Sequence, residues 1–230
     1  MKGIWLPISL ALVLLAGCNP AQTGPTDASS TATAIAVTPQ GDPASRLVAG
    51  LTALKAGDFT TAEREYREAV RLDAQSVAAQ TGLGSALVRL GRFSEAEMAY
   101  RQALELDPNS PGAHANLGTT YYQMNRLPDA AREFETALRI DPSDAATTYQ
   151  LGAVRLQEGN LAAAGDLFDK ARQLDPKLPE VYYGLGVLYR LNGQTEEAIA
   201  AFEKFLALGS PQDPAAIQHA EEELRGLKGQ

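Results

Sequence analysis

Residues 77–110 place apolar side chains at helical spacing in two runs separated by a tight turn. The two runs consist of Leu83, Gly84, Leu87 and Leu90, followed by Ala96, Tyr100, Ala103 and Leu104. Each run predicts a short helix with one apolar stripe. Gly91 is expected to end the first helix, because glycine reaches a left-handed backbone without steric cost. Ser94 is expected to cap the second helix, and Asp107-Pro108 to end it.

The same pattern recurs along the chain with a period of 34 residues. The recurring features are an Asp-Pro pair at 107, 141 and 175, a Leu-Gly pair at 83, 117, 151 and 185, alanine at 96, 130, 164 and 198, and an aromatic ring at 66, 100, 134, 168 and 202. Fixed periods of this length are typical of arrays that stack one helix pair on the next. The sequence therefore predicts an all-α repeat protein.

The motif resembles the tetratricopeptide repeat in its period and in its Leu-Gly, aromatic, alanine and proline positions. Five copies fit without a gap, at 43–76, 77–110, 111–144, 145–178 and 179–212. The resemblance implies a right-handed α-solenoid of five helix pairs. In the third copy Asn125 replaces the turn glycine, and asparagine tolerates the same backbone geometry. Pro128 then falls at the start of a helix, where its missing N–H costs little.

Residues 213–230 are expected to form a capping helix and a short tail. Ile217, Ala220 and Leu224 keep helical spacing there, and Pro214 can open the helix. Such a helix covers the last apolar face of a repeat array. Phe205, at a position where the other copies have a small residue, is expected to pack beneath it.

The chain begins with Lys2 and an apolar run from Ile4 to Gly17, which predicts a signal peptide over 1–17. Leu15-Ala16-Gly17-Cys18 resembles the bacterial lipobox, and the resemblance implies that Cys18 is lipidated. The alternative interpretation is an ordinary signal peptide or an uncleaved membrane anchor, in which Cys18 carries no lipid. The lipoprotein interpretation places the protein at the cell envelope. Asn19 favours the outer membrane facing the periplasm, or the outer face of the cytoplasmic membrane in a single-membrane bacterium.

Residues 18–42 are rich in Ala, Thr, Ser, Pro and Gly and contain no Lys or Arg. A segment of this composition buries too little apolar surface to offset its ordering entropy, so we expect a flexible tether. The formal net charge of the chain is −8. An acidic chain without a basic stripe is a poor candidate for nucleic-acid binding.

We find no catalytic constellation, cofactor motif or metal motif, and we expect a non-enzymatic protein. Cys18 is the single cysteine, and His114 and His219 are the two histidines. His114 is expected to pack in the core, and His219 to be exposed. The Gly82-Leu83-Gly84 run lacks the Gly-Lys-Ser/Thr that completes a phosphate loop, so its glycines are interpreted as close-packing positions.

In the tetratricopeptide family the first helices of the pairs line a concave groove that binds protein or peptide partners. The resemblance assigns the groove here to Thr81, Ser85, Asn116, Thr119, Tyr122, Tyr149, Gln150, Tyr183, Val187 and Arg190. Tyr149 and Tyr183 are expected to offer ring area to a largely apolar partner, or else only to pack against the second helices. The family positions that grip a chaperone's C-terminal carboxylate are Leu47, Leu51, Gly82, Gly112 and Asn116, so that clamp is absent in this register.

These observations favour a lipid-anchored adaptor that holds partner proteins at the envelope. A narrower version is an assembly factor for a pilus or secretin, since those systems include similar lipoproteins with a lipobox, a tether and five or six repeats. The alternatives are a recruiter or modulator of an envelope enzyme such as a peptidoglycan hydrolase, and direct binding of a small molecule or glycan. The oligomeric state is left open by the sequence.

Overall fold

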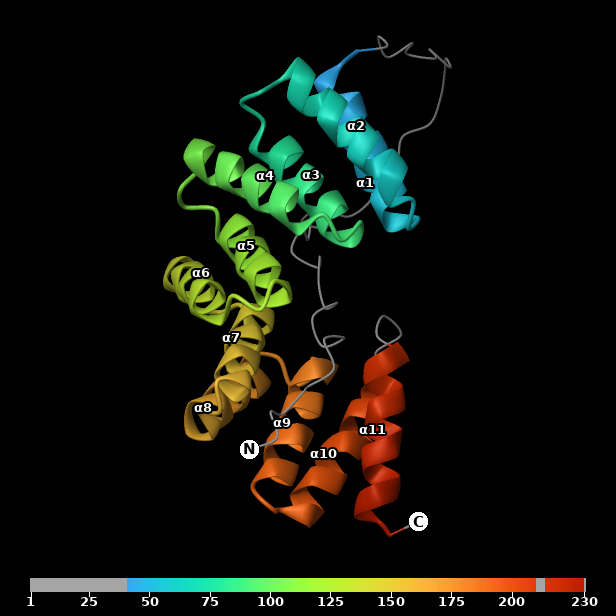
Figure 1. Cartoon of the computed structure of the whole chain (residues 1–230), viewed down its shortest axis with the longest axis vertical. Helices are drawn as coiled ribbons and strands as arrows, with labels where there is room; N and C mark the ends of the chain where they lie inside the picture. Colours follow the sequence, from blue (N-terminus) through green and yellow to red (C-terminus); the bar gives the residue numbers. More distant parts are fainter. Residues whose placement is uncertain (1–40, 210–213, 230) are drawn as a thin grey trace, which may run out of the picture. The chain divides into compact units, whose positions relative to one another are not determined.

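A computed structural model describes residues 41–209 and 214–229, and every regular element within those ranges is an α-helix (Figure 1). The helices are α1 (Pro43–Lys55), α2 (Phe59–Leu72), α3 (Val77–Arg89), α4 (Phe93–Leu106), α5 (Pro111–Gln123), α6 (Leu127–Ile140), α7 (Ala145–Gln157), α8 (Leu161–Leu174), α9 (Pro179–Leu191), α10 (Thr195–Leu208) and α11 (Pro214–Leu227). The prediction of an all-α chain of five helix pairs followed by a further helix is confirmed. The predicted signal peptide, Cys18 and most of the tether lie outside the described residues.

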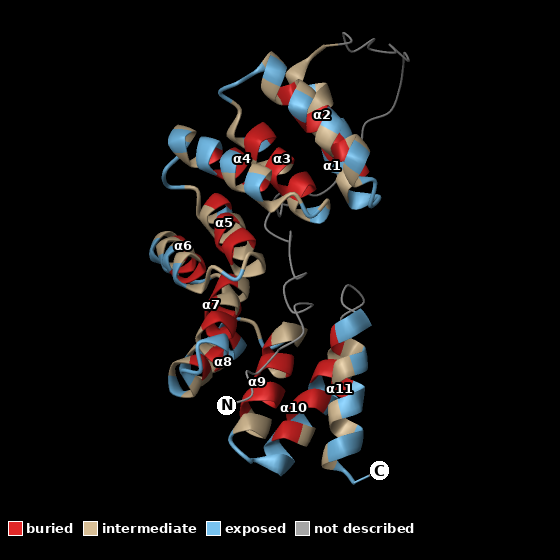
Figure 2. Ribbon diagram, viewed as in Figure 1, coloured by how far each residue is buried: buried red, intermediate tan, exposed pale blue. Residues whose placement is uncertain are grey.

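The helices form two compact units, whose described parts are residues 41–107 and residues 108–229. In the first unit α1 packs on α2, α2 on α3 and α3 on α4, and α1 also contacts α3. In the second unit each helix from α5 to α11 packs on the next, and the first helices of successive pairs, α5, α7 and α9, contact one another. Stacking therefore buries one stripe of each helix within its unit (Figure 2).

The turns inside the helix pairs depend on a left-handed residue at a fixed place. The glycines at 57, 91, 159 and 193 have φ between 74° and 80°. Asn125 holds φ 58° at the matching place, and it is the one non-glycine residue of the described chain with a positive φ. The prediction made for Asn125 is confirmed. Asparagine is tolerated there because its short polar side chain enters this region at less cost than most others.

Within each pair, a glycine of the first helix faces an aromatic ring of the second. A Cβ atom placed on Gly84 would lie 2.7 Å from the ring of Tyr100, and one on Gly186 would lie 2.7 Å from the ring of Phe202. Gly118 and Gly152 face Phe134 and Phe168 in the same way. The recurring Leu-Gly and aromatic positions are thus two halves of one contact, which sets how closely the two helices approach.

The start of α4 differs from the prediction. Ser94 is not its cap, because the helix begins at Phe93, two residues earlier than a cap at Ser94 would place it, and Arg92 occupies the cap position without a side-chain hydrogen bond to the backbone. Arg92 instead donates two hydrogen bonds to the carboxylate of Glu95, at 2.7 and 2.6 Å. First helices do use side-chain caps: Ser76, Ser110 and Asp144 accept hydrogen bonds from the first turns of α3, α5 and α7.

The last helix, α11, completes the core of the second unit. Ala216 and Ala220 are buried in the same cluster as Phe202 and Phe205, and Ile217 and Leu224 pack against that cluster. Phe205 and the buried alanines of α11 share this cluster, which confirms the expectation that Phe205 packs under the capping helix. Figure 1 shows α9, α10 and α11 side by side.

Candidate functional site

The candidate binding surface is formed by the first helices α5, α7 and α9 of the second unit. These helices contact one another in order, so their side chains from successive repeats come together. They carry eight of the ten predicted groove residues: Asn116, Thr119, Tyr122, Tyr149, Gln150, Tyr183, Val187 and Arg190. The remaining two predicted residues, Thr81 and Ser85, lie on α3 of the first unit.

A hydrogen bond joins two of the predicted residues across the junction of α5 and α7. The side-chain amide of Gln150 donates to the hydroxyl oxygen of Thr119 at 3.1 Å. That hydroxyl in turn donates to the carbonyl of Ala115 at 3.0 Å. Thr119, Gln150 and nearby Asn116 are all half-buried. The two helices therefore present uncharged hydrogen-bonding groups whose positions are already set by contacts within the chain.

Tyr122 is the aromatic member of this surface that keeps partial exposure. It lies on the last turn of α5, one turn beyond Thr119. Burial raises the pKa of Tyr122 to about 12, because the phenolate is less well solvated than it is in water. The side chain is accordingly a neutral phenol at physiological pH, able to offer apolar ring area and one hydroxyl to a partner.

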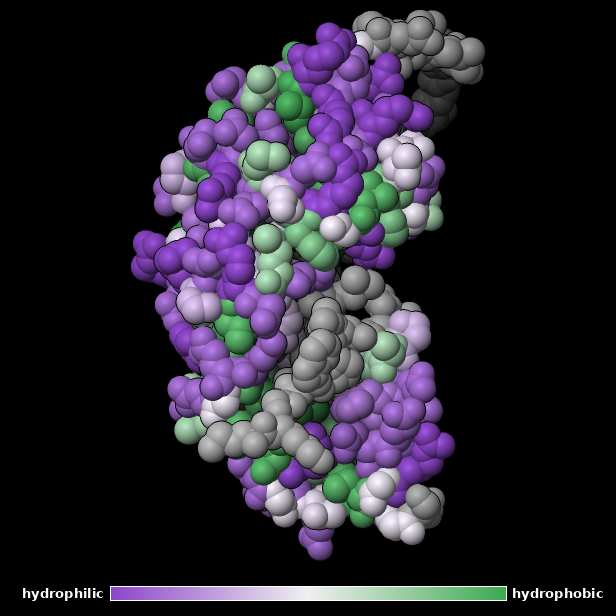
Figure 3. All heavy atoms as spheres, in the orientation of Figure 1, coloured by the Kyte–Doolittle hydropathy of each residue, from purple (hydrophilic) through white to green (hydrophobic). Residues whose placement is uncertain are grey.

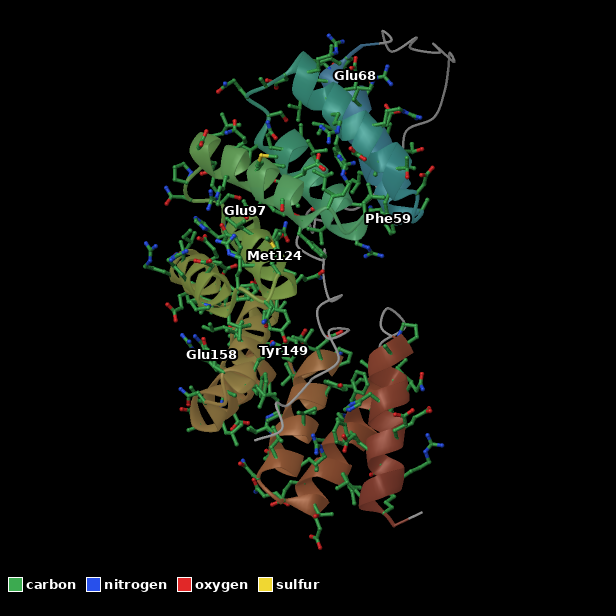
Figure 4. All side chains as sticks on the ribbon, viewed as in Figure 1. Phe59, Glu68, Glu97, Met124, Tyr149 and Glu158 are labelled. Carbon is green, nitrogen blue, oxygen red and sulfur yellow. The ribbon has the colours of Figure 1, made fainter. Side chains whose placement is uncertain are left out.

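Tyr149 and Tyr183 do not offer their rings to a partner, and that expectation is wrong. Each has 2% of its surface exposed. The ring of Tyr149 (labelled in Figure 4) lies 5.6 Å from that of Phe168, between centroids. The ring of Tyr183 contacts Phe202 and Phe205 edge-on, at 6.0 and 5.3 Å. Both tyrosines thus belong to the core between first and second helices, the alternative that the sequence left open.

Val187 and Ser85 are also buried, so they do not provide an accessible surface in this structure. The hydroxyl of Ser85 donates to the carbonyl of Thr81 at 3.0 Å and lies 3.1 Å from the hydroxyl of Tyr100. This contact satisfies the one polar group of Tyr100, whose ring is otherwise enclosed. Thr81 itself is half-buried. Whether the predicted residues bind a partner stays a prediction.

Arg190, the predicted cation of the surface, is already paired with α11. Its Nε atom lies 3.1 Å from a carboxylate oxygen of Glu223, although the contact lacks hydrogen-bond alignment at Nε. The other carboxylate oxygen of Glu223 lies 3.3 Å from Nε2 of His219, and Nδ1 of His219 lies 2.8 Å from the hydroxyl of Tyr183. His219 is therefore half-buried in a polar contact, contrary to the expectation of exposure. The i, i+4 spacing of His219 and Glu223 is the feature of the sequence that could have predicted their contact.

His114 also makes polar contacts where apolar packing was expected. Nδ1 of its ring lies 2.7 Å from a carboxylate oxygen of Glu133, and Nε2 lies 3.1 Å from the carbonyl oxygen of Pro108. The side chain is only 13% exposed. His114 thus ties α5 to α6 and to the segment before α5, a structural role that its position in the repeat did not reveal.

Across 41–209 and 214–229, no three His, Cys, Asp or Glu side chains are grouped in a way that could hold a metal ion. Within the same ranges no helix combines the length and the apolarity that crossing a membrane requires.

Comparison with protein families gives two matches, both to models described as tetratricopeptide repeat. The first covers residues 47–111 and 116–179, which is more than half of the chain. The second covers residues 155–222. No curated protein matches the chain significantly in sequence.

Several solved structures share the fold. TTC0263, a thermophilic TPR protein of Thermus thermophilus, is 22% identical, with 80% of this chain and 99% of that chain covered and a TM-score of 0.69. The pilF protein of Pseudomonas aeruginosa is 21% identical, with 80% and 88% covered and a TM-score of 0.68. YrrB, described as a TPR protein with an unusual peptide-binding site, is 22% identical, with 80% and 94% covered and a TM-score of 0.57.

Proposed function

The chain belongs to the tetratricopeptide repeat family, and we propose from that premise that it is a non-catalytic scaffold that binds partner proteins or peptides. Proteins of this family generally mediate protein–protein or peptide binding. Stacked repeats suit this role because neighbouring units combine small faces into an extended surface.

The observation that carries the proposal is the contact between Gln150 and Thr119. It links the first helices of two successive repeats and leaves both side chains half-buried, next to Asn116 and Tyr122. Amides and hydroxyls held in this way can bond the backbone of a peptide without the entropy cost of ordering them first. We assign the binding surface to these four residues.

The partner segment is expected to be an uncharged or weakly charged peptide with apolar side chains. Tyr122 supplies the ring area, and the nearby amides supply the hydrogen bonds. Arg190 contributes little net attraction for an acid, because Glu223 already offsets its charge. Binding should therefore weaken little with added salt, which screens charge and leaves apolar burial in place.

The test places a photocrosslinking amino acid at Thr119 in cells, with the same group at Arg132 as the control. Arg132 is exposed on α6, a second helix. We expect a specific adduct from position 119 and none from position 132. Affinity for the identified partner is then measured for Gln150→Ala and Tyr122→Ala, with Gln102→Ala on α4 as the matched control. We expect a loss of about twofold to tenfold for the first two variants. Unchanged affinity in both would contradict this assignment.

We further propose that the scaffold is lipid-anchored through Cys18 at a bacterial cell envelope, and that it serves in pilus or secretin assembly. The support is the order of lipobox, tether and repeats, which resembles lipoproteins of those systems. Deleting the gene should reduce assembled pili or secretin multimers, and restoring the chain should recover them. Intact pili and secretins, with altered turnover of peptidoglycan instead, would favour the recruiter of an envelope hydrolase.

A further inference from the structure

The first helix, α1, carries an apolar stripe that faces solvent. Ala44, Val48 and Leu51, followed by Lys55, keep the spacing i, i+4, i+7 and i+11, and all four are exposed. Val48 has 66% of its surface accessible and Leu51 has 44%. The opposite side of the helix, with Gly50 and Ala53, is buried against α2 and α3. In Figure 3 the visible surface in the region of α1 is mostly hydrophilic, with a few hydrophobic residues among the polar ones.

On α3 and α9 the position equivalent to Val48 is covered by the preceding helix pair, whereas on α5 and α7 the half-buried Asn116 and Gln150 occupy it. Gly82 occupies it on α3, where an added Cβ would clash with the ring of Tyr66 on α2. Gly184 occupies it on α9, where the nearest ring is that of Phe168 on α8, at 2.9 Å. On α3 and α9 this side of the first helix is therefore packed against the preceding repeat. On α1 it has no preceding repeat within residues 41–107 to cover it.

The arrangement of charges along the stripe selects a second copy of α1 as the occupant. Lys55 lies at one end of the helix, and the carboxylate of Asp42 caps the other end. An antiparallel pair of α1 helices places Val48 against Leu51 of the other copy and brings each Lys55 toward the opposite Asp42. A parallel pair would instead bring the two lysines together, which is unfavourable. The helix has no acidic residue of its own to repel a copy.

The far end of the array does not match this stripe. The exposed side of α11 includes Glu221, Glu222 and Arg225, which are charged. Covering Val48 and Leu51 with that surface would desolvate charges without pairing them. Head-to-tail stacking of α11 on α1 is thus disfavoured by chemistry, and a closed, two-fold contact remains.

We propose that α1 is a self-association surface, on which two copies pair antiparallel through Val48 and Leu51. The contact is small, because a helix of 13 residues is about 20 Å long. Stable interfaces bury roughly 800 Å² per partner, which is more than one such face supplies. The association is therefore weak and dependent on concentration.

The first test uses disulfide crosslinking of the full chain in cells. Two forms with different tags are produced together, one with Val48→Cys and the other with Leu51→Cys. The chain with Cys18 alone sets the baseline. As a matched control, Val48→Cys is paired with Met98→Cys, since Met98 is 60% exposed on α4. We expect a doubly tagged dimer at several times the yield of the control pair. Equal yields, or none above the baseline, would overturn the proposal.

The second test measures sedimentation of the full chain over a concentration series. Leu51→Glu and Lys55→Glu should each shift dimerisation to higher concentration by roughly tenfold or more, because they introduce charge repulsion at the contact. Met98→Glu should leave it unchanged. A chain that stays monomeric throughout would refute self-association. Crosslinks from position 48 that reach only another protein, or only the N-terminal residues of the same chain, would also refute it, because a different occupant would then cover the stripe.

Discussion

The hydroxyl group of Tyr183 lies 2.8 Å from Nδ1 of His219, and this contact joins α9 to α11. The same histidine contacts Glu223, which pairs with Arg190 back on α9. The helix that closes the array is therefore held by a polar network in addition to the apolar cluster around Phe205.

The first prediction concerns this network. Tyr183→Phe keeps the ring that packs on Phe202 and Phe205 and removes only the hydroxyl. We expect it to lower the free energy of unfolding by about 0.5–1.5 kcal/mol, the typical net value of one hydrogen bond. Urea unfolding of the two proteins measures the difference. A variant as stable as the parent would show that α11 is held by apolar contacts alone.

The second prediction concerns the close approach of paired helices. Gly84→Ala puts a methyl group within 2.7 Å of the Tyr100 ring, which is itself enclosed. We expect a destabilisation of about 1–3 kcal/mol, the usual cost of overpacking a filled core. Gly112→Ala is the matched control, because no heavy atom lies within 4 Å of the added Cβ. It should be neutral, or stabilising by up to about 1 kcal/mol, since alanine favours helix. Equal effects at both positions would contradict the packing explanation.

The third prediction is a pH dependence that arises at Glu65. Hydrogen bonds from Arg64 and Arg46 hold the pKa of this nearly buried carboxyl below its ordinary 4.5. Because the pKa is lower in the folded chain than in the unfolded chain, the stabilisation is fully present above the unfolded value. It is lost as the pH falls through the folded value. Stability should therefore decline below about pH 4.5.

Replacing Glu65 with glutamine should flatten this decline, as followed by thermal unfolding between neutral pH and about pH 3. Glu68→Gln is the control. Glu68 is also hydrogen-bonded to an arginine, Arg71, but solvent screens that exposed pair. If Glu68→Gln changed the pH dependence of stability more than Glu65→Gln does, the burial of a carboxylate would not determine its contribution to that dependence.

The fourth prediction concerns attachment to the membrane. Cys18→Ser should abolish labelling of the chain by an alkyne fatty acid and move it from the membrane fraction to the soluble fraction. Two or more acyl chains hold a protein firmly, at about 0.8 kcal/mol per buried methylene, and the substitution removes their attachment point. Persistent labelling and sedimentation with membranes would show that Cys18 is not the anchor.

The helical repeat was fully predictable from sequence, since a period of 34 residues with apolar positions at helical spacing specifies paired helices and their turns. Even the exceptional turn at Asn125 could be inferred, because the left-handed geometry is a local property of the backbone. The start of α4 was less predictable. Arg92 there bonds Glu95 and also reaches Glu63 on α2, a partner that local sequence does not indicate.

Which side chains remain accessible was decided by tertiary structure alone. Tyr149 and Tyr183 occupy matching places in their repeats, yet Tyr183 is covered in part by α11, a helix from outside the repeats. Val48 and Gly82 also match, and only Gly82 lies beneath a preceding ring. Periodicity determines which side of a helix is apolar. Whether a neighbouring helix lies on that side depends on where the residue stands in the array, and burial follows from that neighbour.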